Sequence, residues 1–333
     1  MTKARDIASA TTPNANAALL ATFPHRNLII NGACVIDQRN SGSSVTPADT
    51  NYTVDRWRYT ASQASKFTFQ QNAGSVTPPA GFENYMGFTV ASAVTVGSGD
   101  YFAITQRIEG YNVNQLEFGT SNAKTVTLSF WVRSSLTGTF GGTLRGASFG
   151  RSYPFTYAIS SANTWEYKTV TVAGDTSGTY QSGNTTGLEV IFGLGVGSTN
   201  SGTAGAWTAS GHFSATGAVS VVGTGSATWY ITGVQLEVGD TATPFEHRSY
   251  GDELARCRRY YQGETRQFLF YYNPSASLVN VNYQEEMRAA PTVTFTTSNG
   301  SPSAGNIGTN NCYFLITAAA SGYYADYTLS AEL

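Results

Sequence analysis

Histidine is the commonest general base and metal ligand in proteins, and the chain has three. His25, His212 and His247 lie far apart, and none belongs to a metal-binding spacing such as HExxH. They fall in segments whose composition indicates an arm, a loop and a linker. We therefore expect all three to be structural, and the sequence assigns no catalytic histidine.

Paired carboxylates would indicate a glycan-cleaving site. Glu285 and Glu286 are adjacent in a segment with a strand pattern, so we expect them on opposite faces, where they cannot flank one bond. Asp100, Glu109 and Glu117 fall at or near the ends of predicted strands, where solvation is the usual reason for a charge. A pair assembled from distant parts of the chain stays open, but no local pattern predicts a hydrolase.

Metal, redox and phosphate chemistry also lack a motif. Cys34, Cys257 and Cys312 are odd in number and widely separated, so they predict neither a disulfide framework nor a metal site. The glycines form neither a GxxxxGK loop followed by Ser or Thr nor a GxGxxG turn between a strand and a helix. We expect no cofactor.

Aromatic side chains are the most informative group. Residues 266–333 carry more rings than the core of a thin β-domain can bury, so some must meet another subunit or face solvent. An exposed Tyr beside amides suits a sugar, because the ring packs on the pyranose while the amides bond its hydroxyls. Tyr271, Tyr272, Tyr323 and Tyr324 are our receptor-binding candidates, because one ring of each adjacent pair must point outward. Packing between subunits is the alternative for each of them.

The elements that position these residues are β-strands. Over residues 27–245 apolar and polar residues alternate, with turn formers about every eight to twelve residues. This pattern predicts a two-sheet sandwich or jelly roll over residues 27–248, whose alternating faces look committed to the sandwich core. In ATWYITGVQLEVGD the apolar positions change parity, which predicts a β-bulge near Thr232 and Gly233.

A stretch rich in Gly, Ser and Thr interrupts the strands at residues 195–217. Trp207 and Phe213 give this stretch side chains to bury, so we expect an ordered surface excursion. After it the pattern changes, and residues 249–333 read as a short helix followed by five strands of a small β-domain. The helix is predicted by acidic residues at its start and basic residues at its end: Asp252, Glu253, Arg256, Arg258 and Arg259.

Composition excludes several function classes. The chain has 333 residues, of which 41% are hydrophobic and 12% are charged, and its net charge is −2. That balance excludes a strongly basic surface for nucleic acid. No run approaches the roughly 18 apolar residues that cross a bilayer, and no secretory signal is recognisable, so we expect a soluble protein made in a cytoplasm.

Residues 1–26 differ from the rest. They are rich in Ala, Thr and Asn and show little periodicity, which predicts an extended attachment arm ordered by a partner. A short helix within residues 3–10 is the one local element this segment could form.

The longest distinctive segment is TWYITGVQLEVGDTATPFEHRSYGDELARCRRYYQ, which spans the predicted bulge and helix. Together with RNLIINGACVIDQRNSG, YTVDRWRY, SFWVRSSLTGTFGGTLRG and NTWEYKTVTVAGDTSGTY, it resembles the tail fibre proteins of tailed bacteriophages over roughly residues 3–262. The opening MTKARDIA and the closing blocks EEMRAAPTVTF and YYADYTLSAEL resemble the same proteins.

This resemblance implies a homotrimeric fibre. It implies that residues 1–26 attach to a tail adaptor or baseplate protein, that the jelly roll is of the carbohydrate-binding type, and that the distal β-domain contacts the host surface. Some jelly rolls of this kind hold a structural calcium through an acid near the last strand. Gly233 stands at that place here, so we expect no metal.

The sequence thus predicts an all-β virion protein of the phage tail. It is expected to be a non-catalytic adhesin that attaches to a host surface glycan such as lipopolysaccharide, with no nucleic acid and no membrane insertion. Two alternatives remain open. One is a structural virion part, such as a tail adaptor or capsid decoration protein. The other is a glycan-depolymerising tailspike, which would show stacked repeats of about 20 residues that are not recognisable here.

Overall fold

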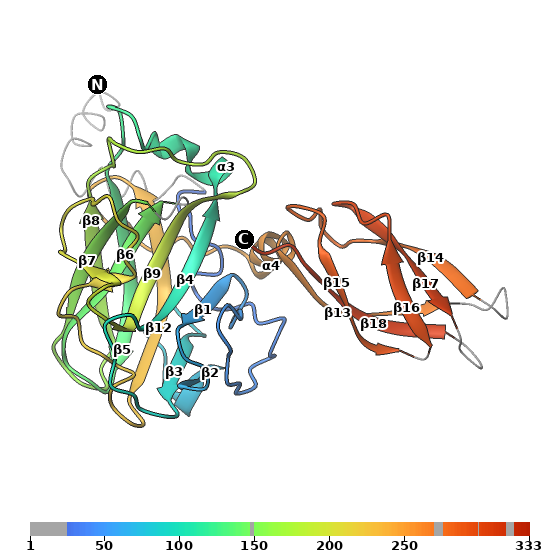
Figure 1. The fold of residues 1–333 in the computed structure, drawn as a ribbon, viewed down its shortest axis with the longest axis horizontal. Helices are drawn as coiled ribbons and strands as arrows, with labels where there is room; N and C mark the ends of the chain where they lie inside the picture. Colours follow the sequence, from blue (N-terminus) through green and yellow to red (C-terminus); the bar gives the residue numbers. More distant parts are fainter. Residues whose placement is uncertain (1–24, 147–149, 270–275, 299, 318–322) are drawn as a thin grey trace, which may run out of the picture.

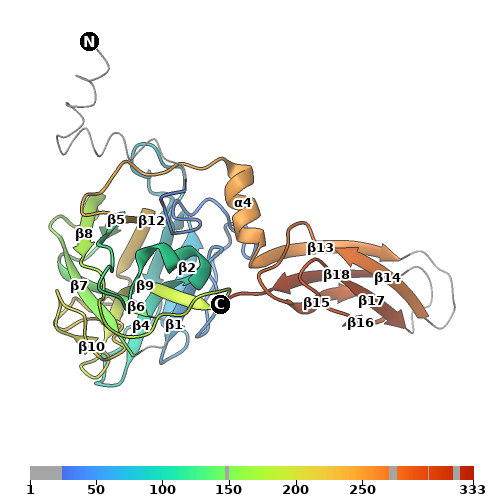
Figure 2. The same ribbon diagram turned by 90° about the horizontal axis from the view of Figure 1, so that it is seen from above.

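The protein forms two lobes of unequal size, joined by a helix (Figure 1). The computed structural model describes residues 25–333 except 147–149, 270–275, 299 and 318–322. The larger lobe is a jelly roll that ends with β12, and the narrower C-terminal β-domain projects from its side (Figures 1 and 2). The predicted all-β fold class is confirmed, whereas the predicted arm falls almost entirely on residues outside this description.

Two five-stranded antiparallel sheets make the jelly roll. The first sheet has the order β1 (Trp57–Ala61), β4 (Tyr101–Glu109), β9 (Thr186–Val196), β6 (Gly138–Gly146) and β7 (Ser152–Ile159). The second has the order β2 (Phe67–Gln71), β3 (Met86–Val90), β12 (Thr228–Val238), β5 (Val126–Ser134) and β8 (Glu166–Val172). Three single-turn helices lie in the connections: η1 (Ala73–Ser75), α3 (Gly110–Val113) and η2 (Asn114–Leu116).

The core lies between the two sheets and is rich in aromatic rings. It forms because alternate residues of each strand point inward. In β5, for example, Val126, Leu128, Phe130 and Val132 are all fully buried. Phe192 of the first sheet lies against Phe130 and Trp229 of the second, with ring centroids 5.0 Å and 5.7 Å away. These contacts fix the distance and register between the sheets.

The predicted bulge in β12 is confirmed. Its pairing with β5 shifts between Thr232 and Gln235, and Gly233 has a φ of 62°. A side chain at Gly233 would also meet the ring of Phe82, so glycine is required there on two grounds. The bulge lets Ile231 and Val234 both face the core although they are three positions apart.

The excursion after β9 is ordered and folds over the outer face of the first sheet. Its short strands β10 (Ser201–Gly202) and β11 (Ser214–Ala215) pair in parallel. A Cβ atom at Gly141 would lie 2.4 Å from the Ser214 hydroxyl, so glycine there lets β11 rest directly on β6. As expected, the excursion is anchored by Trp207, which packs edge-on against Phe118 and Tyr180.

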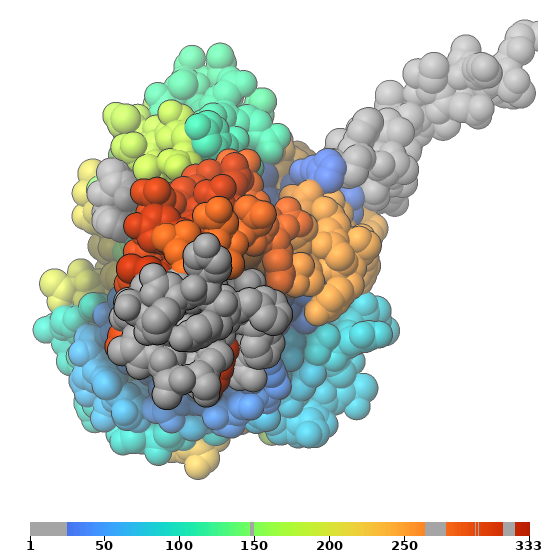
Figure 3. Space-filling view, turned by 90° about the vertical axis from the view of Figure 1, so that its right-hand side faces the viewer, coloured from blue at the N-terminus to red at the C-terminus, as the bar shows by residue number. Residues whose placement is uncertain are grey.

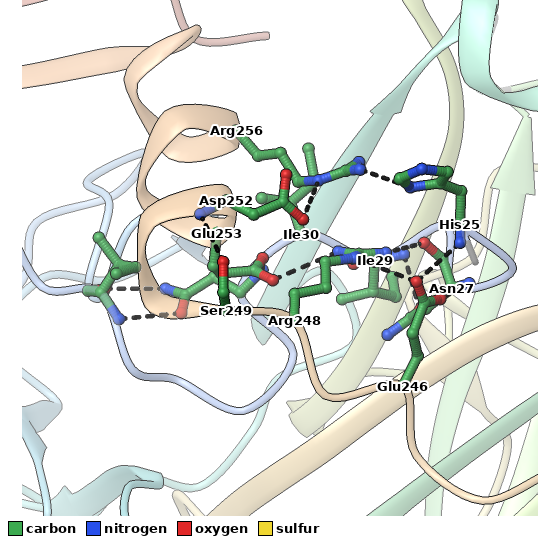
Figure 4. Close-up of polar contacts among 12 residues, drawn as sticks. His25, Asn27, Ile29, Ile30, Glu246, Arg248, Ser249, Asp252, Glu253 and Arg256 are labelled. Atoms are coloured by element: carbon green, nitrogen blue, oxygen red, sulfur yellow. Dashed lines mark hydrogen bonds and ion pairs between the residues drawn. The ribbon is translucent and has the colours of Figure 1, made fainter.

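Helix α4 (Tyr250–Arg258) follows the jelly roll and begins where the sequence predicts. Ser249 caps it by accepting a hydrogen bond from the Asp252 amide. Its inner side, with Cys257, packs on Ile30 and Ile36 of the segment that precedes β1. Figure 4 shows that charged side chains reinforce this contact.

We call this set of contacts the clasp; it consists of His25, Asn27, Glu246, Arg248 and Glu253. The Glu246 carboxylate accepts from the backbone amides of His25 and Asn27 at 2.8 Å and 2.7 Å. Arg248 donates to the backbone carbonyl groups of Ile29 and Asn27, and Glu253 accepts from the Asn31 amide (Figure 4). The acidic residues near the helix start therefore bind the jelly roll as well as favouring the helix dipole.

The C-terminal β-domain has two three-stranded sheets. One has the order β13 (Tyr261–Leu269), β18 (Tyr323–Ser330) and β15 (Thr292–Ser298). The other has the order β14 (Ala276–Asn282), β17 (Asn311–Thr317) and β16 (Ser301–Gly305). The prediction of five strands missed β16, whose sequence SPSAG has no apolar alternation and which pairs with β17 alone.

The carboxylates Glu285 and Glu286 are not in a strand, and that expectation is wrong. They follow the end of β14, in the connection to β15, where Gln262 holds the chain by bonds to the Glu285 carbonyl and the Gln284 amide. The small core of this domain lies nearby and contains Val281, Met287, Cys312, Phe314, Tyr327, Leu329 and Ala331.

Buried charges join the C-terminal domain to the jelly roll. Arg56, which is 1% exposed, forms an ion pair with Glu332 and lies 3.5 Å from the ring centroid of Tyr260. Arg39 bridges Glu332 and Asp55 at 3.0 Å and 2.9 Å. Figure 3 looks toward the C-terminal domain, which stands in front of the jelly roll with blue and cyan segments below it and green segments above. The domain thus projects from the middle of one side of the jelly roll.

Among the described residues, no helix is long and apolar enough to span a bilayer.

Candidate functional site

A cleft of about 230 Å³ opens on the outer face of the first sheet, and we call it the sheet-face cleft. It is lined by Arg58 of β1, by Tyr101, Thr105 and Arg107 of β4, by Arg145 of β6, by Glu189 of β9, and by Asp49, Thr60 and Phe213. The outer face of this sheet, which lies outside the sandwich core, therefore carries a cleft of its own.

Strand register gathers the charged residues of the cleft. Glu189 in β9 lies opposite Arg107 in β4 on one side and opposite Arg145 in β6 on the other. One row further along, Arg58 lies opposite Thr105. Because side chains directly opposite each other share a face, these five point outward together.

Glu189 is the fully buried centre of the charged row. Its Oε1 accepts from Arg107 Nε at 2.7 Å, and its Oε2 accepts from Arg145 Nε at 2.6 Å. Arg107 also donates through Nη1 to the backbone oxygen of Leu333 at 2.8 Å. Both carboxylate oxygens are thus occupied, so Glu189 orients the two guanidinium groups and does not itself face a ligand.

Aromatic rings form the other wall. Phe213 of the excursion stacks on Tyr101 of β4 with ring centroids 4.7 Å apart and planes 7° apart. The Arg145 guanidinium, which binds Glu189, also lies 4.3 Å from the Phe213 ring centroid. The excursion therefore closes the cleft with a ring that is fixed on both sides, which makes a rigid apolar surface beside polar groups.

Two polar groups in the cleft have no hydrogen-bond or ion-pair partner among the residues that the structure describes. Within the part of the chain that the structure describes, the Arg58 side chain makes no hydrogen bond or ion pair. Burial and the neighbouring Arg107 charge lower the pKa of Arg58 below its ordinary value. Thr105 is 2% exposed, and its hydroxyl likewise has no partner among the described residues. Unpaired polar groups in a partly enclosed site are suited to a polar ligand.

The size of the cleft limits what it can hold. A volume of about 230 Å³ is below the roughly 300–1,000 Å³ usual for pockets that take drug-sized molecules. It suits one sugar residue or the end of a chain, held by a ring on one side and guanidinium groups on the other.

The receptor-binding candidates from the sequence are only partly visible. Tyr271 and Tyr272 lie outside the described residues. Tyr323 is described by its backbone, which pairs with Leu269, and Tyr324 is partly buried opposite Phe268 in the neighbouring strand. The proposed role of these four tyrosines stays a prediction.

The histidines occupy three separate places. His25 Nδ1 lies 2.7 Å from Arg256 Nη2 in the clasp, and His247 packs against Phe82 and Phe245. His212 borders β10, where its ring would meet a side chain at Gly202, and burial lowers its pKa. Among the described residues, no group of three or more His, Cys, Asp or Glu is arranged to hold a metal ion.

One expectation about carboxylates near strand ends is wrong. Glu109 is 2% exposed and pairs with Arg259 of the helix end at 3.2 Å, so it is a buried junction residue and not a solvated one. Asp100 accepts from the Gly97 amide and the Ser62 hydroxyl, both at 2.8 Å, and shapes a turn. Glu117 pairs with Lys124 at 3.2 Å on the surface.

Sequence reasoning missed every charged residue of the cleft. The available signal was a charge within largely uncharged strands: Arg107 in YFAITQRIE, which also ends in Glu109, Arg145 in GTFGGTLRG and Glu189 in TGLEVIFGLGV. In a chain with only 12% charged residues, a charge in the middle of a strand is unusual enough to mark a face.

No protein-family model matches the sequence, and no curated protein matches it. Solved structures similar to this chain include the enzymatically active domain of tailspike protein 4 of bacteriophage CBA120, at 14% identity and a TM-score of 0.37, covering 65% of this chain and 22% of that chain. A family 11 carbohydrate-binding module from Clostridium thermocellum with a mixed-linked tetrasaccharide has 13% identity and a TM-score of 0.29, covering 61% and 97%. The module TmCBM61, with β-1,4-galactotriose, has 10% identity and a TM-score of 0.33, covering 64% and 99%.

Proposed function

We propose that the protein is a non-catalytic adhesin of a bacteriophage tail fibre and that the sheet-face cleft binds a glycan of the host surface. The observation that carries the glycan-binding part is the cleft itself. It sets a fixed aromatic surface beside polar groups, two of which, Arg58 and Thr105, have no partner within the described residues. Sugars require this combination of an apolar face and hydrogen-bonding groups.

A binding role is favoured over hydrolysis by the state of the carboxylates. Cleavage of a glycosidic bond needs two carboxyl groups free to act on one linkage. In the cleft, Glu189 gives both oxygens to arginines, and Asp49 accepts from the Ala61 amide at 2.9 Å. This arrangement supports recognition without bond cleavage.

The tail-fibre part of the proposal rests on the resemblance in residues 3–262. We propose a homotrimer in the virion tail, attached to an adaptor or baseplate protein through residues 1–26, with lipopolysaccharide or a similar surface glycan as receptor. One small cleft gives weak binding, and three copies on one fibre give the avidity that attachment needs. Light scattering of the purified protein measures the oligomeric state, and a monodisperse monomer would contradict this assembly.

The test compares adsorption of labelled protein variants to bacteria that the wild-type protein binds. Phe213→Ala removes the aromatic wall and the ring that packs against Tyr101 and Arg145, and we expect adsorption to fall about two- to tenfold, since an aromatic contact is worth about 0.5–1.5 kcal/mol. Tyr167→Ala is the matched control, because Tyr167 is a 44% exposed aromatic residue of β8 in the second sheet. Adsorption of the Tyr167→Ala variant should equal that of the wild-type protein.

A second arm of the test carries Ala at Tyr271, Tyr272, Tyr323 and Tyr324. If these changes abolish adsorption while Phe213→Ala leaves it intact, the receptor site is in the C-terminal domain and the cleft is not the site. The same protein incubated with purified surface polysaccharide should release no shorter chains. Release of oligosaccharides would show that the protein is a depolymerase.

A further inference from the structure

We infer that the sheet-face cleft selects a glycan residue with an anionic group, and that Arg58 is the residue that pairs with that group. This inference rests on the proposed glycan-binding function and deepens it by naming the ligand class. The group is a carboxylate, as in a uronic acid, or a phosphate attached to a sugar.

The first argument is the charge balance of the cleft. Its lining contains three guanidinium groups and two carboxylates. Glu189 is shared between Arg107 and Arg145, and Asp49 is exposed at the edge. Arg58 forms no ion pair with a described residue, although the more distant charges of Glu189 and Asp49 attract it, so the lining leaves an unpaired cation at one defined place.

The second argument is the position of Arg58. It is held on β1 in register with Thr105 of β4, and both side chains line the cleft. A partly buried guanidinium beside the Arg107 charge is unfavourable in the free protein, and burial and Arg107 together lower its pKa. Such a group is stabilised by an anion that accepts its planar pair of N–H donors.

The third argument is Thr105. Its hydroxyl is buried, has no partner among the described residues and lies directly across the strand pair from Arg58. A carboxylate or phosphate that enters beside Arg58 offers further acceptor oxygens for this hydroxyl. The sugar ring that carries the anion would then lie beside Phe213 and Tyr101, which line the same cleft.

The experiment titrates the full-length protein with three small probes: sodium galacturonate, its methyl ester, and galactose 6-phosphate. Binding is followed by NMR of the arginine Nε–H groups, with Arg58 assigned from the Arg58→Gln spectrum. We expect one or both anions to shift the Arg58 signal and to bind at least tenfold more tightly than the neutral ester. If galacturonate binds more tightly than galactose 6-phosphate, the anionic group is a carboxylate. If galactose 6-phosphate binds more tightly, it is a phosphate.

Arg58→Gln should remove this preference and leave the anion no tighter than the ester. Lys66→Gln is the matched control, because it removes the same charge from a partly exposed position that does not line the cleft. The inference is overturned if neither anion binds better than the ester, or if Arg58→Gln keeps the preference.

Cell adsorption separates this inference from the proposed function. If Phe213→Ala abolishes adsorption while Arg58→Gln leaves it at the wild-type level, the cleft binds the receptor but does not require an anion. If neither change alters adsorption, the glycan-binding function of the cleft fails as well.

Discussion

Arg58 makes the free protein less stable than it could be. Its guanidinium is partly buried, unpaired among the described residues and next to Arg107. We therefore expect Arg58→Gln to raise the free energy of unfolding by about 1 kcal/mol, as changes that relieve a functional site often do. Urea denaturation of both proteins without ligand measures this.

The Arg107→Gln variant is the comparison for Arg58→Gln. It should lower the free energy of unfolding, because buried Glu189 then keeps only Arg145 as an ionic partner. If Arg58→Gln is as destabilising as Arg107→Gln, Arg58 stabilises the fold and is not an unpaired group that is available to a ligand.

Single residues were also where sequence reasoning was weakest. Glu109 and Glu189 look alike in the sequence, as lone acids in or beside apolar strands. Both are buried because of arginines more than 40 positions away, namely Arg259, Arg107 and Arg145. An ion pair between distant residues leaves no periodic trace, so solvation was the default interpretation for Glu109, and Glu189 was not singled out at all. The structure gives both residues an arginine partner.

At the scale of elements, we expect the stability that the clasp provides to depend on pH. Burial raises the pKa of the Glu246 carboxyl, but the amides of Asn27 and His25 and the charges of Arg248 and Arg26 lower it more, so its pKa lies below the ordinary 4.5. Because the native pKa of Glu246 is lowered, the clasp stabilises the protein fully at a pH above the ordinary pKa of the carboxyl group. This stabilisation is lost as the pH falls through the native pKa.

Glu246→Gln should therefore destabilise the protein by about 2 kcal/mol at neutral pH, the size expected for hydrogen bonds to a charged group. The difference from wild type should shrink as the pH falls well below 4.5. Urea denaturation of both proteins over a pH series checks this. A difference that stays constant with pH would show that the charge of Glu246 does not stabilise the clasp.

Elements were the scale at which the sequence was most informative. Period-two alternation depends only on which face of a strand is buried, so β5 and β9 could be predicted from their own residues. The change of parity around Thr232 and Gly233 located the bulge for the same reason. Strand β16 could not be found, because an edge strand held by backbone hydrogen bonds needs no apolar pattern.

For the whole molecule, a buried ion pair connects the two lobes. Glu332 lies next to Ala331, a core residue of the C-terminal domain, and reaches into the jelly roll to pair with Arg56 and Arg39. Arg288 adds hydrogen bonds to the Ala331 and Glu332 carbonyls and to the Asn184 carbonyl of the jelly roll. No sequence pattern indicated this junction, since its members come from four separate segments of the chain.

Removing the Glu332 charge should uncouple the lobes. Glu332→Gln leaves Arg56 buried with the face of Tyr260 but without its carboxylate, and breaking a buried pair in this way typically costs about 3–5 kcal/mol. We expect one unfolding transition in the wild-type protein and two in the variant, together with a broader distribution of dimensions in small-angle scattering. Glu286→Gln, which changes an exposed carboxylate of the same domain, should preserve the single transition. If Glu332→Gln also unfolds in one transition with unchanged dimensions, hydrogen bonds such as those of Arg288 are enough to hold the C-terminal domain in place.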